Sequence, residues 1–222
     1  FGAEATSPLS GMEARLPLAV KRAALAVEAL HKASLAHDDI EDNDPYRYGT
    51  ATLHRLYGAP AAINVGDYLI GLGYRLVAGE AADLGGDCVA DILGFLTQAH
   101  LRLAAGQGAE LRWTEEASPM PTPLDVLQVY ALKTAPAFEA PFYIGTRMAG
   151  VKIDLGLFRS IFRNVGVAYQ VLNDLEDWDE DKNDKKVSGR DAIKGRPTIL
   201  RAFALEKAAL LPVLQSGDVD PM

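Results

Sequence analysis

The chain has 222 residues, of which 49% are hydrophobic and 23% are charged, and both values are ordinary for a folded globular protein. Its formal net charge of −8 argues against nucleic acid as a partner, because surfaces that bind nucleic acid are usually basic. The single cysteine, Cys88, excludes an internal disulfide, and no apolar run approaches the roughly 18 residues of a membrane span. We therefore expect a cytoplasmic protein without a membrane span. Because the chain begins at Phe1 rather than Met, we also expect that it lacks an N-terminal segment.

The hydrophobic periodicity is helical along nearly the whole chain. In chain order, helices are predicted over Pro17 to about Ile40, Pro60 to Glu80, Asp87 to about Trp113, Pro123 to Gly150 and Leu155 to about Trp178, and a last one begins near Pro197. Pro136 has no amide N–H to donate, so we expect a bend in the fourth helix. Alternation typical of strands is missing, and no stretch resembles a domain linker. Residues 1–222 are therefore predicted to form one all-α domain, a bundle of long helices.

Two acidic clusters each end a predicted helix. Their members are Asp38, Asp39 and Asp42 in "HDDIEDND" and, about 135 residues later, Asn173, Asp174 and Asp177 in "NDLED". Side chains four residues apart lie about 40° apart around a helix, so Asp38 and Asp42 share a face. The C-terminal end of a helix disfavours carboxylates, and two such accumulations indicate bound cations. Oxygen ligands of this kind favour Mg²⁺, which commonly bridges carboxylates to a substrate phosphate.

The acidic clusters have two other interpretations. A solvated acidic helix end is the alternative for either cluster taken alone, and the repetition of the spacing beside basic residues favours the metal site. An EF-hand is excluded, because the first cluster has no twelve-residue loop with Gly at its sixth position and Glu at its last.

Basic and polar residues accompany the clusters and are candidates for binding a diphosphate. They are His31, Arg47, Lys133, Thr134, Gln170, Lys186 and Arg196. For each cation alone, a solvated surface side chain is the alternative, and for His31 a buried structural role.

Five stretches together resemble the trans-isoprenyl diphosphate synthase (polyprenyl synthetase) family. They are "LHKASLAHDDIEDND", "GD" at 66–67, "KT" at 133–134, "YQVLNDLED" and "GRDAIKGRPT". The resemblance spans Ala24 to about Ala202. It implies the isoprenoid synthase fold, with helices around a central cavity, and usually a homodimer. It also implies about three Mg²⁺ ions and the head-to-tail condensation of an allylic prenyl diphosphate with isopentenyl diphosphate.

The resemblance also implies roles for individual residues. The residues expected at the metal are Asp38, Asp39, Asp42, Asn173, Asp174 and Asp177. The residues expected to hold the allylic diphosphate are Arg47, Lys133, Thr134, Gln170 and Arg196, with His31 touching isopentenyl diphosphate. Lys186, in the loop after the second cluster, is a further candidate for binding substrate phosphates. Those expected to be catalytic are Asp38, Asp42, Lys133 and Asp174.

The sequence departs from the family pattern at positions that bear on the reaction. Asn173 stands where Asp is usual, and Tyr48 replaces a second arginine after the first cluster. Arg196 stands where Lys is usual, which preserves the charge. The leading hypothesis is a chain-elongating prenyltransferase. A class I terpene cyclase on the same fold, which needs no isopentenyl diphosphate, and a weakly active regulatory subunit of a heteromeric synthase are the alternatives.

Product length is predicted from Ala33 and Ser34, which lie about one turn before Asp38. Relatives that stop at fifteen carbons tend to carry aromatic rings at these two positions, which close the floor of the cavity. Small residues leave that floor open, and each added isoprene unit buries more apolar surface at roughly 25 cal/mol per Å². We therefore expect a product of about twenty carbons or longer. The alternative is that both residues are small only because another helix packs closely there.

Overall fold

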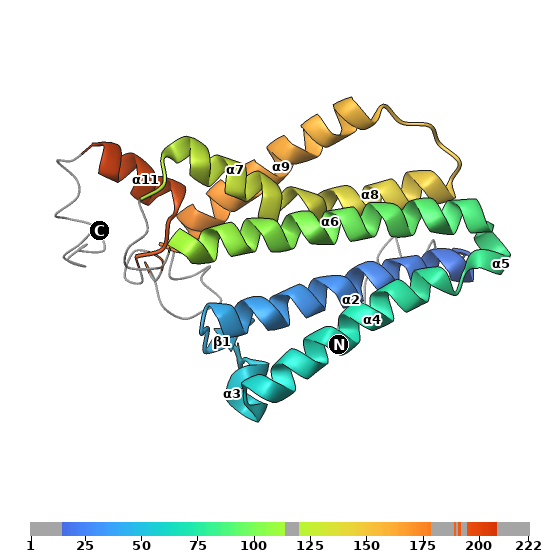
Figure 1. Ribbon diagram of the computed structural model, residues 1–222, viewed down its shortest axis with the longest axis horizontal. Helices are drawn as coiled ribbons and strands as arrows, with labels where there is room; N and C mark the ends of the chain where they lie inside the picture. Colours follow the sequence, from blue (N-terminus) through green and yellow to red (C-terminus); the bar gives the residue numbers. More distant parts are fainter. Residues whose placement is uncertain (1–14, 114–119, 179–188, 190, 192–194, 208–222) are drawn as a thin grey trace, which may run out of the picture.

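The computed structural model describes residues 15–113, 120–178, 189, 191 and 195–207 (Figure 1). Its helices are α2 (Leu18–Glu41), α3 (Leu53–Tyr57), α4 (Ala59–Ala78), α5 (Ala81–Leu84), α6 (Gly86–Trp113), α7 (Pro123–Lys133), α8 (Ala135–Met148), α9 (Leu155–Glu176) and α11 (Ile199–Glu206). Two short strands, β1 (Tyr46–Arg47) and β2 (Thr50–Ala51), pair antiparallel. The predicted all-α fold is confirmed. None of the described helices is both long enough and apolar enough to cross a lipid bilayer.

The structure divides the fourth predicted helix into α7 and α8. The break falls at Thr134, which ends one helix and begins the next with φ −119° and ψ −43°. Pro136 lies in the first turn of α8, where a missing amide N–H costs no helical hydrogen bond. The bend expected at this proline is therefore present as a helix boundary. The short hairpin and the short helices α3 and α5 were not predicted, because elements of two to five residues carry no readable periodicity.

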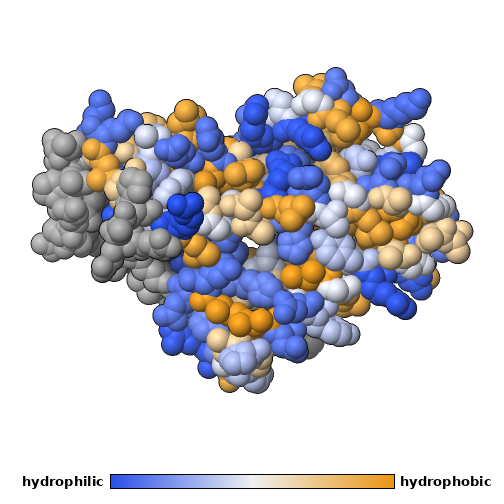
Figure 2. Space-filling model, in the orientation of Figure 1, coloured by the Kyte–Doolittle hydropathy of each residue, from blue (hydrophilic) through white to orange (hydrophobic). Residues whose placement is uncertain are grey.

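Helices α2 and α4 lie side by side and pack closely because the residues between them are small (Figure 1). The buried hydrophobic residues of α2 are all alanines: Ala19, Ala23, Ala26, Ala29, Ala33 and Ala36. On α4, a Cβ added to Gly66 would lie 2.2 Å from Nε2 of His37, and one added to Gly73 would lie 2.6 Å from Cγ of Leu30. On this face of the molecule, Figure 2 shows a narrow opening between α2 and α6.

A second close approach joins α9 to the boundary between α7 and α8. A Cβ added to Gly166 would lie 2.6 Å from both the amide nitrogen and Cα of Ala135. Since the obstructing atoms are backbone, no side-chain rotation could relieve the overlap. Gly166 therefore sets the position of α9 against Thr134, the residue that separates α7 from α8.

Two hydrophobic clusters form the core. The larger joins α2, α4, α6 and α8 and includes Ile92 and Leu96. The smaller joins α7 to α11 through Val126, Tyr130 and Ile199, with α9 residues packed against it. The smaller cluster supports the end of the bundle at which the acidic residues lie.

The contact at Gly166 gives a stability prediction. Gly166→Ala should lower the free energy of unfolding by more than about 1 kcal/mol, because the added methyl group forces backbone apart. Gly94→Ala in α6 is the matched control, since nothing lies within 4 Å of its added Cβ. That control should gain about 0.5–1 kcal/mol from helix propensity. Urea unfolding of both variants measures the difference, and equal stability would contradict the packing described here.

Candidate active site

The two acidic clusters lie at the same end of the bundle. Asp42 caps the C-terminus of α2, and Asp177 caps the C-terminus of α9. Helices α7 and α11 converge on the same end (Figure 1). Both clusters therefore lie at helix C-termini, where the helix dipole does not stabilise carboxylates.

Asp38 lies near a half-buried lysine at this end. Burial raises the pKa of Asp38 to about 6, and the charges of Asp42 and Glu41 also raise it, while Lys133 opposes them. Lys133 donates from Nζ to Oε2 of Glu110 on α6 at 2.7 Å. Burial would lower the pKa of Lys133, but Glu110 and the first acidic cluster outweigh it, and the net shift is upward. A lysine whose charge is held in place by Glu110 therefore stands near the carboxylates of the first acidic cluster.

Asp39 lies on a different side of α2 from Asp38 and Asp42. Its side chain is 8% exposed, and its Oδ1 accepts from Nε of Arg47 at 2.7 Å and lies 2.6 Å from the second guanidinium nitrogen. The hairpin of β1 and β2 carries Arg47 back to the helix end. Arg47, the residue that pairs with Asp39, is also expected to bind the diphosphate. Metal binding by Asp39 stays a prediction.

Arg196 connects the two acidic ends. Its guanidinium lies 3.0 Å from Oδ2 of Asp42, 3.4 Å from Oδ1 of Asp44 and 3.0 Å from Oδ1 of Asp191. The backbone N–H of Asp191 donates to Oδ2 of Asp177 at 3.0 Å. Burial would lower the pKa of Arg196, but these carboxylates raise it overall, so the guanidinium is firmly charged.

Asp174 is buried in a hydrogen-bond network. Tyr130 donates its hydroxyl to Oδ2 of Asp174, and the backbone N–H of Ile199 lies 3.0 Å from the tyrosine oxygen and 3.3 Å from the carboxylate. Gln170 donates to Oδ1 of Asp174 at 3.4 Å and accepts from Thr134 at 3.1 Å. Burial raises the pKa of Asp174 to about 6 against these hydrogen bonds. The network ties α7, α9 and α11 together, which favours a positioning role for Asp174.

The remaining predicted residues are placed as follows. Asn173 is exposed at the end of α9. The side chain of His31 is 49% exposed, and its Nδ1 lies 3.9 Å from Glu28. Ser34 is half-buried and donates to the carbonyl of His31 at 2.9 Å. Lys186 lies outside the described residues.

Sequence reasoning missed the partners of the predicted residues. Glu110 holds Lys133, Tyr130 holds Asp174, and Asp44 with Asp191 holds Arg196. Tyr130 carried a usable signal, since a tyrosine on the apolar face of a helix commonly finds a partner for its hydroxyl. The pairing of Glu110 with Lys133 joins residues on different helices and had no such signal.

The residues at this end fit a metal ion that a phosphate helps to hold. Among the described residues, no three His, Cys, Asp or Glu side chains are grouped closely enough to hold an ion by themselves. Mg²⁺ does not require such a group, because it typically binds one or two carboxylates, waters and substrate phosphates. Asp38 and Asp42 offer two hard oxygen ligands on one helix face. Burial is the main cause of the raised pKa of Asp38, and a bound cation would favour its ionised form.

Comparison with known proteins gives a consistent result. The family model described as polyprenyl synthetase matches residues 7–216. A geranylgeranyl diphosphate synthase of Cereibacter sphaeroides is 33% identical over 192 residues, which cover 84% of this chain and 63% of the relative. The chloroplastic geranylgeranyl pyrophosphate synthase of Capsicum annuum is 30% identical, with 84% and 52% covered. The chain thus spans between half and two thirds of the length of these curated relatives.

Solved structures agree with the sequence comparison. A geranylgeranyl pyrophosphate synthetase from Pyrococcus horikoshii superposes with a TM-score of 0.75 at 33% identity, covering 86% of this chain and 58% of that one. Another geranylgeranyl pyrophosphate synthase gives a TM-score of 0.77 at 25% identity, covering 88% and 58%. With the helical fold and the doubled acidic motif in place, the family match over nearly the whole sequence shows that the chain belongs to the polyprenyl synthetase family.

Proposed function

We propose that this chain is the catalytic part of a Mg²⁺-dependent prenyltransferase. It condenses an allylic prenyl diphosphate with isopentenyl diphosphate and makes a polyprenyl diphosphate of about twenty carbons or longer. The observation that carries the proposal is the pairing of the carboxylates at the end of α2 with two half-buried cations, Lys133 and Arg196. Arg196 also pairs with Asp191, whose backbone N–H donates to Asp177 at the end of α9. The names of the similar proteins, which are geranylgeranyl diphosphate synthases, support the same reaction class.

The side chains at the acidic end suit the departure of a diphosphate. Asp38 and Asp42 would hold Mg²⁺, which supplies charge neutralisation of the leaving group when bound. Lys133 and Arg196 would exchange their carboxylate partners for phosphate oxygens, so the charge that develops on the diphosphate meets fixed cations. Thr134 and Gln170, already hydrogen-bonded to each other at 3.1 Å, would orient the diphosphate. Thr134 is buried and the other groups are half-buried, so part of the surrounding water is already displaced from the site proposed for the diphosphate.

A terpene cyclase is the second candidate function, and Tyr48 favours it. The ring of Tyr48 takes the place of a second arginine, is 63% exposed and lies 5.4 Å from Nζ of Lys32. A cyclase would convert a prenyl diphosphate alone, whereas a chain-elongating enzyme needs isopentenyl diphosphate. Product analysis with and without isopentenyl diphosphate distinguishes the two functions. A regulatory subunit would give no product under either condition.

We also propose a cytoplasmic homodimer. The single cysteine, buried in the core, supports a reducing compartment. The family resemblance supports the dimer, and light scattering during gel filtration would measure its mass.

Loss of an acidic ligand should strongly reduce turnover. We expect Asp42→Ala to lower the incorporation of labelled isopentenyl diphosphate by at least about 10²-fold, because a group that stabilises developing charge is removed. Asp83→Ala, an exposed acid on α5, is the control and should keep full activity. Full activity of the wild type in excess chelator would contradict the role of Mg²⁺.

The metal should bind more weakly in acid. The folded-state pKa of Asp38 is raised to about 6, so this carboxyl is mostly ionised at pH 7.5 and mostly protonated at pH 5.5. A proton and Mg²⁺ compete for the same oxygens. The rise in the unfolding temperature caused by Mg²⁺ and an allylic diphosphate analogue should therefore be larger at pH 7.5. Asp38→Asn should remove most of this pH dependence, and a larger rise at pH 5.5 would contradict the assignment.

Product length should respond to Ser34 more directly than to Ala33. Ser34 shares a helix face with Asp38, whereas Ala33 is fully buried on the alanine-rich face of α2. Ser34→Phe should shift the product toward fifteen carbons. Ala33→Phe should mainly cost about 1–3 kcal/mol of stability through overpacking. Chromatography of the products and urea unfolding measure both effects, and unchanged length in Ser34→Phe would place the floor elsewhere.

A further inference from the structure

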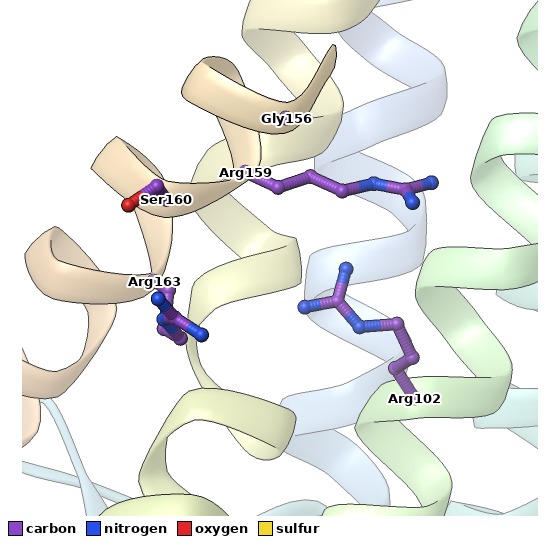
Figure 3. A pocket seen from close by; sticks show the side chains of 5 residues that line it. All are labelled: Arg102, Gly156, Arg159, Ser160 and Arg163. Atoms are coloured by element: carbon purple, nitrogen blue, oxygen red, sulfur yellow. The ribbon is translucent and has the colours of Figure 1, made fainter.

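A second polar feature lies away from the acidic end. A pocket of about 260 Å³ opens between α6 and α9 and is lined by Arg102, Gly156, Arg159, Ser160 and Arg163 (Figure 3). Three guanidinium groups therefore line one small space. None of these arginines belongs to the proposed diphosphate-binding set.

A buried carboxylate fixes the first of these arginines. Glu139 on α8 is fully buried and receives two hydrogen bonds from Arg102, at 2.5 Å and 3.2 Å. This paired geometry immobilises the guanidinium and compensates its charge. An arginine has five N–H donors, and two of those of Arg102 are used here. Arg102 thus keeps donors for a ligand in the pocket.

The charges of the other two arginines are not compensated in this way. Arg159 and Arg163 are exposed, lie four residues apart on α9 and form no ion pair with an acidic side chain in the described part of the chain. Asp154, the nearest acid in sequence on that helix, accepts hydrogen bonds from the amides of Gly156 and Leu157 at 2.8 Å and 3.1 Å. Like charges at this spacing repel each other by a few tenths of a kcal/mol. Figure 3 shows the side chain of Arg159 extending from α9 toward that of Arg102.

We propose that this pocket binds a small phosphate-class oxyanion. Three guanidinium groups and one carboxylate leave an excess of two positive charges, which suits a multiply charged anion. The planar guanidinium fork matches phosphate oxygens in geometry as well as in charge. The volume lies below the roughly 300–1,000 Å³ of pockets for drug-sized ligands, so a compact anion fits better than a prenyl chain.

The pocket is separate from the proposed catalytic end. Arg159 precedes Asn173 by 14 positions, which corresponds to about 21 Å along an ideal helix. The inference therefore does not rest on the proposed function. The anion can be free phosphate or diphosphate, or the diphosphate head group of a prenyl diphosphate, since the recognising chemistry is shared.

Thermal unfolding tests the site. Sodium phosphate, sodium diphosphate and geranyl diphosphate are added in turn in excess chelator, with chloride adjusted to hold the ionic strength constant. Constant ionic strength removes the general screening of repulsion between arginines. The proteins compared are the wild type, Arg159→Gln, Arg163→Gln and the control Arg75→Gln, which changes an exposed arginine on α4. In parallel, Arg196→Gln removes a cation of the acidic end.

The expected result is a rise in unfolding temperature that each pocket variant reduces by at least half. Arg75→Gln should show the full rise in unfolding temperature. Arg196→Gln should still show the share of the rise that is lost in Arg159→Gln and Arg163→Gln. A rise in unfolding temperature with inorganic phosphate or diphosphate supports a free anion as the ligand. A rise only with geranyl diphosphate supports a prenyl diphosphate head group, provided that Arg163→Gln removes that rise. An equal rise in the wild type and both pocket variants, or no rise in the wild type, would overturn the proposal.

Discussion

The structure depends on how it neutralises the negative charge gathered at the ends of α2 and α9. Three cations approach the carboxylates at the end of α2 from three different elements: Arg47 from the hairpin, Lys133 from the end of α7 and Arg196 from the segment before α11. The end of α9 is linked to them through Asp191, which pairs with Arg196 and donates its N–H to Asp177. Each cation comes from a different part of the chain, so the acidic end forms only when the whole bundle is assembled. Burial nevertheless raises the pKa of Asp38 to about 6, so its carboxyl ionises less readily than a solvent-exposed one. A bound divalent cation is the natural complement of such a site.

Small residues place the helices that carry these charges. A Cβ on Gly106 would lie 2.7 Å from the amide nitrogen of Lys133, so α6 can approach the end of α7 closely enough for Glu110, one turn later, to reach the lysine. Gly166 likewise lets α9 approach the backbone of Ala135 at the start of α8. The hydrogen bond from Thr134 to Gln170 joins the same two elements. The chemistry of the acidic end thus rests on backbone spacing set several residues away.

Much of this arrangement could be predicted from local sequence, and the remainder could not. Periodicity locates the long helices, the spacing of Asp38 and Asp42 fixes their shared face, and Pro136 marks the boundary of α8. The partner of Asp39 was not predictable, because Arg47 reaches it through a turn in which Tyr48 has a φ of 50°. The contact of Asp174 with Tyr130 spans 44 positions, and such long-range pairs leave no periodic signal in one sequence.

We propose that Asp38 and Asp42 hold divalent cations together with a diphosphate. Electron paramagnetic resonance of Mn²⁺, used in place of Mg²⁺, measures bound metal directly in the presence of an allylic diphosphate analogue. Tightly bound Mn²⁺ should appear only when the analogue is present, and Asp42→Asn should bind it at least about tenfold more weakly. Equal Mn²⁺ binding in the wild type and in Asp42→Asn would contradict this proposal.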